Sequence, residues 1–194
     1  MTLSVVVGLG RSGIGAARLL KAQGSEVVVL EKAENVACTR KSADLRQQGI
    51  DVQLGQPLEI SSFEPWIDEI DQVVISPGIA WTHPTLEALR TRGVPVKGEM
   101  ALAWETLKKH PWIGITGTNG KTTVTHLLHH VLNHGGLKAP MAGNVGYSAA
   151  ELALGCLEGS SPLPDWVVME MSSYQIEAAN EVAPRIGILS LIHI

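Results

Sequence analysis

Cysteine and positive charge are both in short supply in this sequence of 194 residues. The two cysteines, Cys38 and Cys156, form no metal-binding or redox motif, so we expect a reducing compartment rather than a disulfide-bonded scaffold. The net charge of −4 comes without a basic stripe, so we expect no nucleic acid partner. The cysteine usage favours a cytoplasmic location.

Long apolar runs and aromatic residues are scarce as well. The N-terminal segment MTLSVVVGLGRSG has no charged leader region, and Gly8 and Gly10 interrupt its apolar stretch. It therefore predicts neither a signal peptide nor a membrane-spanning segment, and we expect no membrane insertion. Aromatic residues make up only 4% of the chain, so the apolar content of 45% comes mostly from Val, Ile, Leu and Ala. This mixture is typical of short buried parallel strands joined by tight turns.

Strand and helix patterns alternate along the whole chain. The predicted strands cover residues 3–7, 26–30, 51–55, 71–79 with its Pro-Gly turn, 94–98, 112–116, 137–143, 166–171 and a stretch from 185. The predicted helices cover residues 12–23, 41–49, 83–93, a part of 98–110, 122–133, 148–154 and about 174–180. This βαβ rhythm predicts an α/β protein with a Rossmann-like parallel-sheet domain over residues 1–97 and a second α/β domain over residues 98–194.

Gly8, Gly10 and Gly13 form the pattern G-x-G-x-x-G between a predicted strand and a predicted helix. Glycines at these positions let the backbone turn tightly and approach a pyrophosphate at the helix N-terminus. Glu31 follows the second predicted strand, where an acidic residue would meet a ribose hydroxyl. Taken alone, these residues predict a dinucleotide site. The other interpretation is a tight turn that binds no ligand, and the motif does not name the nucleotide.

The stretch GITGTNGKTT, residues 114–123, has the ending of a P-loop. Ile115 stands where the strict Walker pattern has its first glycine, so the loop is G-x-x-G-x-x-G-K-T. The backbone N–H groups of residues 118–123 are expected to converge on phosphate oxygens. Lys121 is expected to reach the β- and γ-phosphates, and the Thr122 hydroxyl to bind Mg²⁺. A purely structural turn would not need lysine and threonine directly after the glycine.

Together these stretches resemble the Mur ligase family, whose members build the peptide of bacterial peptidoglycan. GITGTNGKTT is similar to the ATP loop of the family, GLGRSGIGAARLL to its N-terminal loop, and VISPGI to a substrate-contacting turn. GNVGYSA and EMSSYQIE are similar to its central-domain motifs, and the Ser-Ser-Tyr-Gln ending favours the members that add D-glutamate. The resemblance covers residues 3 to about 188 in the expected order. It implies that the second domain is an incomplete P-loop ATPase domain.

The resemblance implies one reaction for the two glycine loops. The first domain would hold the UDP end of UDP-N-acetylmuramoyl-L-alanine, and the second would hold ATP with Mg²⁺. The L-alanine carboxylate would attack the γ-phosphate, and the amine of D-glutamate would attack the resulting acyl phosphate. Positioning and charge neutralisation would supply most of the acceleration. The implied enzyme is an ATP-dependent, amide-forming ligase of peptidoglycan biosynthesis, monomeric in its full-length form.

By position, the resemblance also implies a set of site residues. The expected catalytic residues are Lys121, Asn144 and Glu170, and the expected metal ligands are Thr122 and Glu170. The expected ATP-binding residues are Thr118, Asn119, Gly120, Lys121, Thr122, Thr123 and Val124. The expected substrate-binding residues are Gly10, Arg11, Ser12, Glu31, Ser76, Gly78, Asn144 and Ser172, with Glu31 in place of the commoner aspartate. The alternatives are a water-facing strand-end carboxylate for Glu170 and a turn residue for Asn144.

Two other functions stay open on the sequence. The N-terminal glycine loop and Glu31 also suit an NAD-dependent oxidoreductase, which would leave residues 114–123, the lysine loop, unexplained. A non-catalytic nucleotide-binding module would bind ATP without consuming it. His126, His130 and His134 recur every four residues on a predicted helix, without an H-E-x-x-H arrangement. We interpret them as a solvated helix face rather than a metal site.

The last residues depart from the family pattern. The resemblance implies an Asp-His pair beyond the strand that begins near Arg185, then a modified lysine and a third domain, but no aspartate precedes His193. Residues 189–194, LSLIHI, translate CTG TCT CTT ATA CAC ATC, the transposase mosaic-end adaptor of sequencing libraries, so we expect a non-native tail there. The alternative is a genuine apolar strand. We expect this chain alone not to complete the ligation, and to expose an apolar sheet edge that promotes aggregation.

Overall fold

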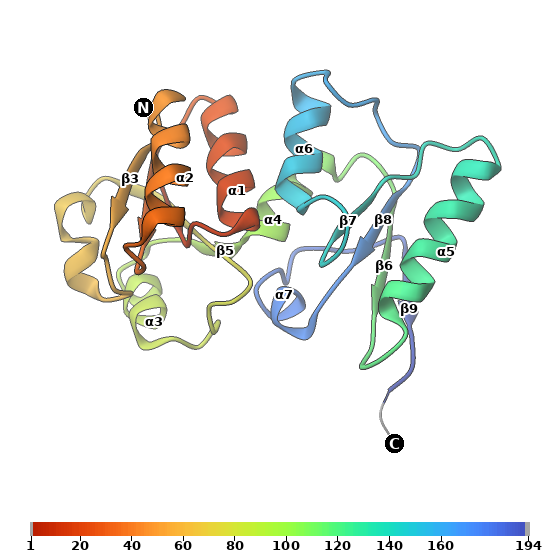
Figure 1. The fold of residues 1–194 in the computed structure, drawn as a ribbon. Coiled ribbons are helices and arrows are strands. Elements are labelled where there is room, and N and C mark those ends of the chain that lie inside the picture. The colour runs from red at the N-terminus through yellow and green to blue at the C-terminus, as the bar shows by residue number, and fades with distance from the viewer. Residues whose placement is uncertain (1, 193–194) are drawn as a thin grey trace. The chain divides into compact units, whose positions relative to one another are not determined.

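The structure is a computed structural model that describes residues 2–192. The chain divides into two units, Met1–Glu99 and Met100–Ile194, and each described unit contains one parallel β-sheet (Figure 1). The predicted α/β class is confirmed. In the described part of the chain, no helix has the length and apolar character needed to cross a membrane.

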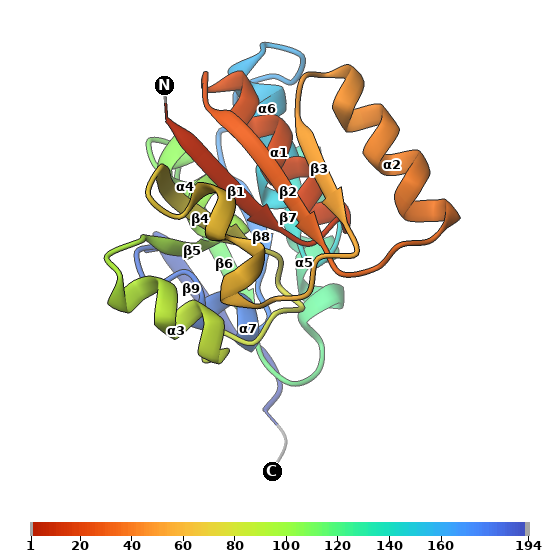
Figure 2. The ribbon, with the colours of Figure 1, turned by 90° about the vertical axis from the view of Figure 1, so that its left-hand side faces the viewer.

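The sheet of the first unit has five strands in the order β3-β2-β1-β4-β5. The strands are β1 (Leu3–Val7), β2 (Glu26–Glu31), β3 (Asp51–Leu54), β4 (Ile70–Ile75) and β5 (Val96–Gly98). All their pairings are parallel, and Figure 2 shows β1, β2 and β3 side by side. The central strand β1 is buried along its whole length, as its valine run predicts for a strand covered on both faces.

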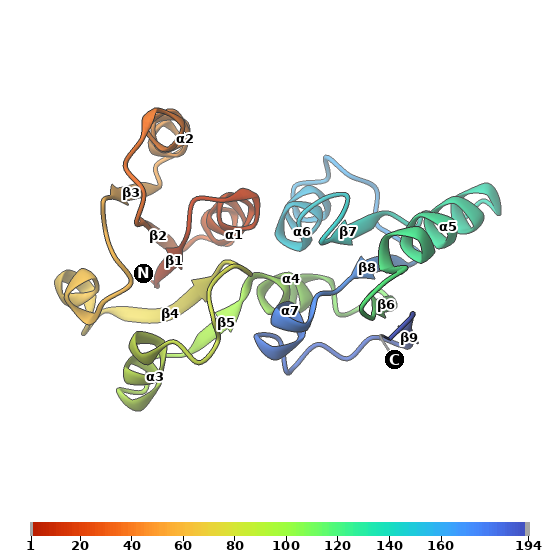
Figure 3. The same cartoon turned by 60° about the horizontal axis from the view of Figure 1, so that its bottom comes forward.

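Helices cover both faces of this first sheet. They are α1 (Arg11–Ala22), α2 (Val36–Gln47) and α3 (Pro84–Thr91). Figure 3 shows α1 and α2 on one side of the sheet and α3 on the other. The small and apolar residues Gly13, Ala16, Ala17 and Leu20 form the buried face of α1. This arrangement is the doubly wound one that the βαβ rhythm predicted.

One local prediction in this unit was wrong. Helix α2 begins at Val36 rather than Lys41, because the Asn35 side chain accepts a hydrogen bond from the Cys38 N–H and caps the helix. No helix or strand was predicted for residues 56–69, which contain the 3₁₀ turns η1 (Ile60–Ser62) and η2 (Glu64–Trp66). Phe63, between these two turns, is fully buried and fixes them to the unit.

The sheet of the second unit has four described strands in the order β7-β8-β6-β9. The strands are β6 (Trp112–Thr116), β7 (Met141–Gly143), β8 (Val167–Glu170) and β9 (Ile186–Leu189). The helices are α4 (Glu99–Leu107, which begins at the last residue of the first unit), α5 (Lys121–His134), α6 (Ala149–Leu157) and α7 (Ser173–Glu177). Figure 1 shows α5 alongside this sheet, where Val124, Leu128 and Leu132 pack on a core that includes Ile115 and Val168.

Strand β7 is shorter than predicted, since only Met141–Gly143 of the expected 137–143 forms a strand. Ahead of it, the Ala139 N–H donates to the Asn133 side chain at the end of α5 rather than to a neighbouring strand. Strand β9 pairs with β6 alone among the described strands, and Ile186 and Leu189 are 42% and 63% exposed. The expected apolar sheet edge is therefore present.

The segment expected to be a non-native tail begins inside this strand. Leu189 is the last residue of β9 and pairs with Thr116. Residues 190–192 continue beyond it, and His193 and Ile194 lie outside the described residues. The expected origin of residues 189–194 stays a prediction that the underlying DNA sequence tests.

Candidate functional site

The first glycine loop packs too closely for larger residues at two of its positions. Gly8 has a φ of +101°, which favours glycine, and a Cβ on Gly13 would lie 1.9 Å from the Gly8 carbonyl oxygen. Gly10 is the N-cap of α1 and has no side chain with which to cap the helix. The loop therefore presents the N-terminus of α1, with Arg11 and Ser12 in its first turn, at the carboxyl end of β1.

Glu31 connects the glycine loop to the end of β2. One carboxylate oxygen accepts a hydrogen bond from the Leu9 N–H at 2.6 Å, and the other accepts from the Ala33 N–H at 2.8 Å. Sequence reasoning expected this carboxylate to meet a ribose hydroxyl, and the structure shows that it first holds backbone. Lys41 was not expected near the loop, but its Nζ donates to the Leu9 carbonyl oxygen at 3.2 Å. No local motif marks that contact, because α2 supplies it.

Ser76 follows β4, the strand on the other side of β1. Its Oγ is buried and has no hydrogen-bond partner among residues 2–192. A Cβ added to Gly8 would lie 2.7 Å from this oxygen, so Ser76 packs directly against the glycine loop. Gly78, two residues further, is exposed. Five of the expected substrate-binding residues thus lie at the carboxyl ends of three adjacent strands: Gly10, Arg11, Ser12, Glu31 and Ser76.

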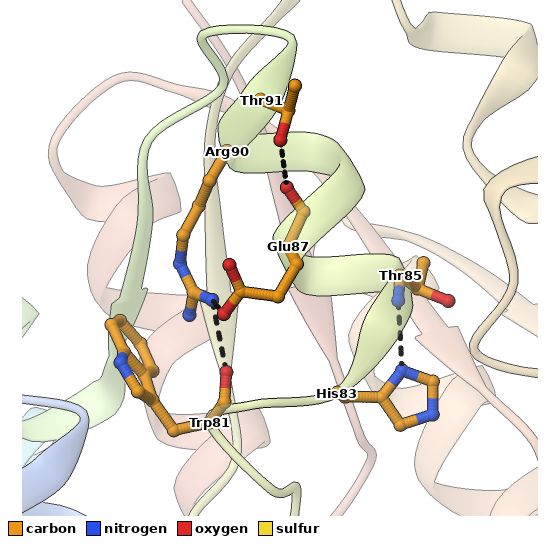
Figure 4. A network of polar contacts seen from close by, with 6 residues as sticks. All are labelled: Trp81, His83, Thr85, Glu87, Arg90 and Thr91. Carbon is orange, nitrogen blue, oxygen red and sulfur yellow. Dashed lines mark hydrogen bonds and ion pairs between the residues drawn. The ribbon is translucent and has the colours of Figure 1, made fainter.

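The turn that follows Ser76 is held by Arg90, a residue of α3 that sequence reasoning missed. Figure 4 shows the contacts: the Arg90 Nη1 donates to the Trp81 carbonyl oxygen at 3.1 Å and forms a 2.6 Å ion pair with Glu87. The guanidinium also lies 3.9 Å from the centroid of the Trp81 ring, a cation–π contact. At the start of α3, the His83 Nδ1 accepts a hydrogen bond from the Thr85 N–H. These contacts fix the chain between β4 and α3.

The second loop has the backbone geometry of a phosphate-binding turn. Gly117 and Gly120 have φ values of +140° and +76°, and α5 begins directly after Gly120 without a side-chain cap from the described residues. The Lys121 Nζ donates to the carbonyl oxygens of Gly117 at 2.7 Å and Thr118 at 3.2 Å. The ammonium therefore rests on its own loop. Thr122 and Thr123 lie in the first turn of α5 and are exposed.

Not every backbone group of this loop is open to a ligand. The N–H groups of Thr118 and Asn119 donate to the Leu191 carbonyl oxygen, at 2.9 Å and 3.0 Å. The Val124 N–H donates to the Gly120 carbonyl oxygen as part of α5, and the Val124 side chain packs on the core. Sequence reasoning assigned all these residues to ATP. In the structure Val124 packs on the core as part of α5, and its assignment to ATP stays a prediction.

Glu170 ends β8 at the carboxyl edge of the second sheet. It pairs with Ile115 on the adjacent strand β6, so Glu170 and the loop that follows β6 lie at the same edge of the sheet. Glu170 is fully buried, and its Oε1 accepts a hydrogen bond from the Asn144 Nδ2 at 2.9 Å. Its Oε2 is buried without a hydrogen-bond partner in the described chain. The water-facing alternative for Glu170 is thus wrong.

Asn144 and Gly143 shape the approach to this carboxylate. Besides its side-chain contact, the Asn144 N–H donates to the Glu170 carbonyl oxygen at 3.0 Å. Gly143 has a φ of +99°, and a Cβ there would lie 2.2 Å from the same carbonyl oxygen. Only glycine allows the two backbones to come this close. A carboxylate oxygen without a donor among the described residues, held beside a phosphate-type loop, suits a hard cation such as Mg²⁺.

Ser172 has a local structural role in this chain. It is the N-cap of α7, where its side chain accepts from the Gln175 N–H while the Gln175 side chain accepts from the Ser172 N–H. This capping box holds the chain immediately after Glu170 and Met171. The S-x-x-Q spacing in SSYQ could have predicted the cap. Gln175, which is 5% exposed, was not singled out from the sequence.

The histidines of α5 do not form a metal centre. Within residues 2–192 there is no group of three or more His, Cys, Asp or Glu side chains placed to hold an ion. His126, His130 and His134 are exposed, and the rings of the last two stack with centroids 6.0 Å apart. The interpretation as a solvated helix face is confirmed. His129 instead contacts the Ala139 carbonyl oxygen through its Nδ1 at 2.7 Å.

Comparisons with known proteins agree across both units. The family model for the MurD-like N-terminal domain of Mur ligases matches residues 2–98, and the model for the Mur ligase middle domain matches residues 115–193. Curated relatives named UDP-N-acetylmuramoylalanine–D-glutamate ligase include one from Prochlorococcus marinus (strain MIT 9313), 64% identical, and one from Synechococcus sp. (strain CC9902), 62% identical. Each match covers 97% of this chain and 41% of the relative. These matches do not favour the NAD-dependent alternative.

Solved structures support the fold. A murein peptide ligase from Psychrobacter arcticus 273-4 matches all of this chain and 44% of its own, with a TM-score of 0.57 and 18% identity. A UDP-N-acetylmuramate:L-alanyl-γ-D-glutamyl-meso-diaminopimelate ligase from Neisseria meningitides matches all of this chain and 61% of its own, with a TM-score of 0.59 and 20% identity. At these identities the likeness concerns the fold alone.

Proposed function

Because the chain belongs to the Mur ligase family, we propose that it supplies the sugar-nucleotide and ATP sites of an enzyme that adds D-glutamate to UDP-N-acetylmuramoyl-L-alanine. The chain spans about two fifths of the length of the curated relatives it matches, at 41%, so the reaction proposed is that of the whole protein. Such an enzyme is an ATP-dependent, amide-forming ligase of peptidoglycan biosynthesis, and we place it in the cytoplasm as a monomer.

The proposal rests mainly on the position of Glu170 at the same sheet edge as the lysine loop. The carboxylate and the loop belong to adjacent parallel strands, and one oxygen of the carboxylate has no hydrogen-bond donor among the described residues. The residues present fit a magnesium ion, since Glu170 and the Thr122 hydroxyl are both oxygen ligands. When bound, the ion would neutralise charge on the phosphates during phosphoryl transfer. Asn144 would hold the carboxylate in position through its 2.9 Å hydrogen bond.

The protein groups would contribute mainly position and charge. Lys121 would exchange the carbonyl oxygens of Gly117 and Thr118 for phosphate oxygens of ATP, which accept hydrogen bonds from a cation more strongly. Gly120 and the first turn of α5 would direct backbone N–H groups at the same phosphates. The L-alanine carboxylate of the sugar substrate would then attack the γ-phosphate of ATP and release ADP, and the D-glutamate amine would displace phosphate from the resulting acyl phosphate to form the amide.

The first unit would bind the uridine diphosphate part of the sugar substrate. The N-terminus of α1, whose N-cap is a glycine, suits a diphosphate, and the Ser76 hydroxyl beside it, which has no partner among the described residues, suits a further polar group of the ligand. Glu31 would hold the loop in place and still offer free lone pairs to a ribose hydroxyl, because each carboxylate oxygen accepts more than one hydrogen bond.

Nucleotide titration tests the assignment of Glu170. We expect Glu170→Gln to weaken the binding of ATP in the presence of Mg²⁺ by about ten-fold or more, with little effect when Mg²⁺ is chelated. Glu158→Gln is the matched control, because Glu158 is an exposed carboxylate at the end of α6. The substitutions are close in size, so the fold is kept. If Glu170→Gln bound ATP with the same Mg²⁺ dependence as the parent chain, the proposed site would be wrong.

A further inference from the structure

The segment that follows β9 occupies part of the lysine loop. The Ser190 N–H donates to the Thr116 carbonyl oxygen at 2.7 Å and so extends the pairing of β9 with β6 by one bond. This directs the Leu191 carbonyl oxygen at the loop, where it accepts the N–H groups of Thr118 and Asn119. Leu191 forms an isolated antiparallel bridge with Asn119 as well.

Residues 190–191 pack closely against both glycines of the loop, Gly117 and Gly120. A Cβ on Gly117 would lie 3.1 Å from the Ser190 carbonyl carbon and 3.2 Å from the Leu191 oxygen. A Cβ on Gly120 would lie 2.7 Å from the Ser190 Oγ. The two glycines of the loop thus face residues 190–191 rather than open space. A phosphate approaching the amides of Thr118 and Asn119 would meet the Leu191 carbonyl first.

Whatever the origin of residues 189–194, we propose that in this chain residues 190–191 act as an internal competitor of the nucleotide, with the Leu191 carbonyl oxygen in the place of a phosphate oxygen. This inference rests on the proposed function of the loop. A carbonyl oxygen that accepts two converging N–H groups takes the position and hydrogen-bond geometry of a bound phosphate oxygen, without its charge. ATP therefore binds fully only after the segment leaves the loop, and the measured affinity of the chain is lower than the intrinsic affinity of the site.

The way the segment is held lets it leave. The side chains of Leu191 and Ile192 are 68% and 57% exposed, so little apolar burial retains them. Within residues 2–192, the backbone hydrogen bonds of Ser190 and Leu191 are the main attachment of the segment. A phosphate oxygen carries a full charge, and its hydrogen bonds to the same N–H groups are stronger than those of a neutral carbonyl. The segment therefore covers the loop when no nucleotide is bound and leaves it when ATP binds.

Two proline variants of the whole chain test the competition. Ser190→Pro removes the N–H that donates to Thr116 and so releases the segment from β6. Ile192→Pro is the matched control, because it leaves the Ser190 N–H and the Leu191 carbonyl oxygen in place. Amide hydrogen exchange of Thr118 and Asn119, followed by NMR, reports directly whether the Leu191 oxygen covers them. Titration with ATP and Mg²⁺ reports the competition.

The expected pattern has two parts. The Thr118 and Asn119 amides are protected in the parent chain and in Ile192→Pro, and exchange rapidly in Ser190→Pro. ATP binds Ser190→Pro about ten- to thirty-fold more tightly than the other two proteins, from the loss of two neutral hydrogen bonds.

Three results would count against this expectation. Unprotected amides in the parent chain would overturn the inference without reference to any nucleotide. Equal ATP affinities in all three proteins would overturn it while the proposed function stands. Failure of ATP to bind any of the three would overturn the proposed function, and the competition with it.

Discussion

Replacing Gly13 by alanine should destabilise the first unit far more than the same change at Gly10, three residues earlier in the same loop. The added Cβ at position 13 would lie 1.9 Å from the Gly8 carbonyl oxygen, 2.9 Å from the Gly8 carbonyl carbon and 3.1 Å from the Ser76 Oγ. The first two are backbone atoms, so no change of rotamer relieves the contact. Either α1 or the strand end before it has to move.

The size of the effect follows from two opposing contributions. Alanine favours a helix over glycine by up to about 1 kcal/mol. Forcing extra volume into a packed site costs about 1–3 kcal/mol, and the shortness of this contact places it at the upper end. We therefore expect a net loss of about 2 kcal/mol in the free energy of unfolding of this unit. A Cβ on Gly10 meets no atom within 4 Å, so Gly10→Ala should cost under about 1 kcal/mol.

Hydrogen exchange is the suitable assay, because a chain of two units need not unfold in one step. The amides of Val5, Val6 and Val7 lie in the central strand β1 and report the opening of the first unit alone. A loss of about 2 kcal/mol speeds their exchange about thirty-fold. Equal exchange rates in Gly13→Ala and Gly10→Ala would refute the close packing of Gly13 against Gly8.

Two further predictions concern Arg90 and Cys156. Arg90→Met removes the hydrogen bond to the Trp81 carbonyl oxygen and the cation–π contact, so we expect the free energy of unfolding to fall by about 1–2 kcal/mol and proteolysis within residues 76–83 to become faster. Glu87→Gln keeps both contacts and should leave the cleavage rate near that of the parent, so equal rates in the two variants would contradict the role of Arg90. Burial raises the pKa of the Cys156 thiol, so this thiol ionises at a lower pH in the unfolded chain than in the folded one. The free energy of unfolding should therefore fall as the pH rises above about 8.5. Urea unfolding of Cys156→Ser should show a smaller fall over the same range, and an identical fall would contradict the assignment.

The elements that the sequence predicts well are those whose signals are local. The valine run of residues 3–7 is apolar enough to name a buried strand, and the glycines at 8, 10 and 13 mark the turn that follows it. The lysine loop is recognisable for the same reason. Ser76 was named by the family resemblance alone, and the parallel order of the strands explains why it lies with Glu31 beside the first glycine loop.

The errors and omissions occur where a single side chain, or a residue distant in the sequence, determines the local structure. Asn35 begins α2 earlier than the apolar pattern does, because a cap depends on a single side chain. The 3₁₀ turns on either side of Phe63 depend on one buried ring. The contact of Leu191 with the lysine loop depends on the pairing of β9 with β6, which no neighbouring residue reveals. The cap formed by Ser172 was not predicted, although its S-x-x-Q spacing indicates one, and the assignment of Ser172 to substrate stays a prediction.

The two hydrogen bonds accepted by Glu31 have a thermodynamic consequence for ligand recognition. With Leu9 and Ala33 already attached to one carboxylate, the turn before α1 is ordered in the absence of any bound molecule. A sugar nucleotide arriving there does not have to freeze a loose loop, so little of its interaction energy is lost to conformational entropy. Its entropy of association should reflect released water and the stiffening of the ligand more than the ordering of protein.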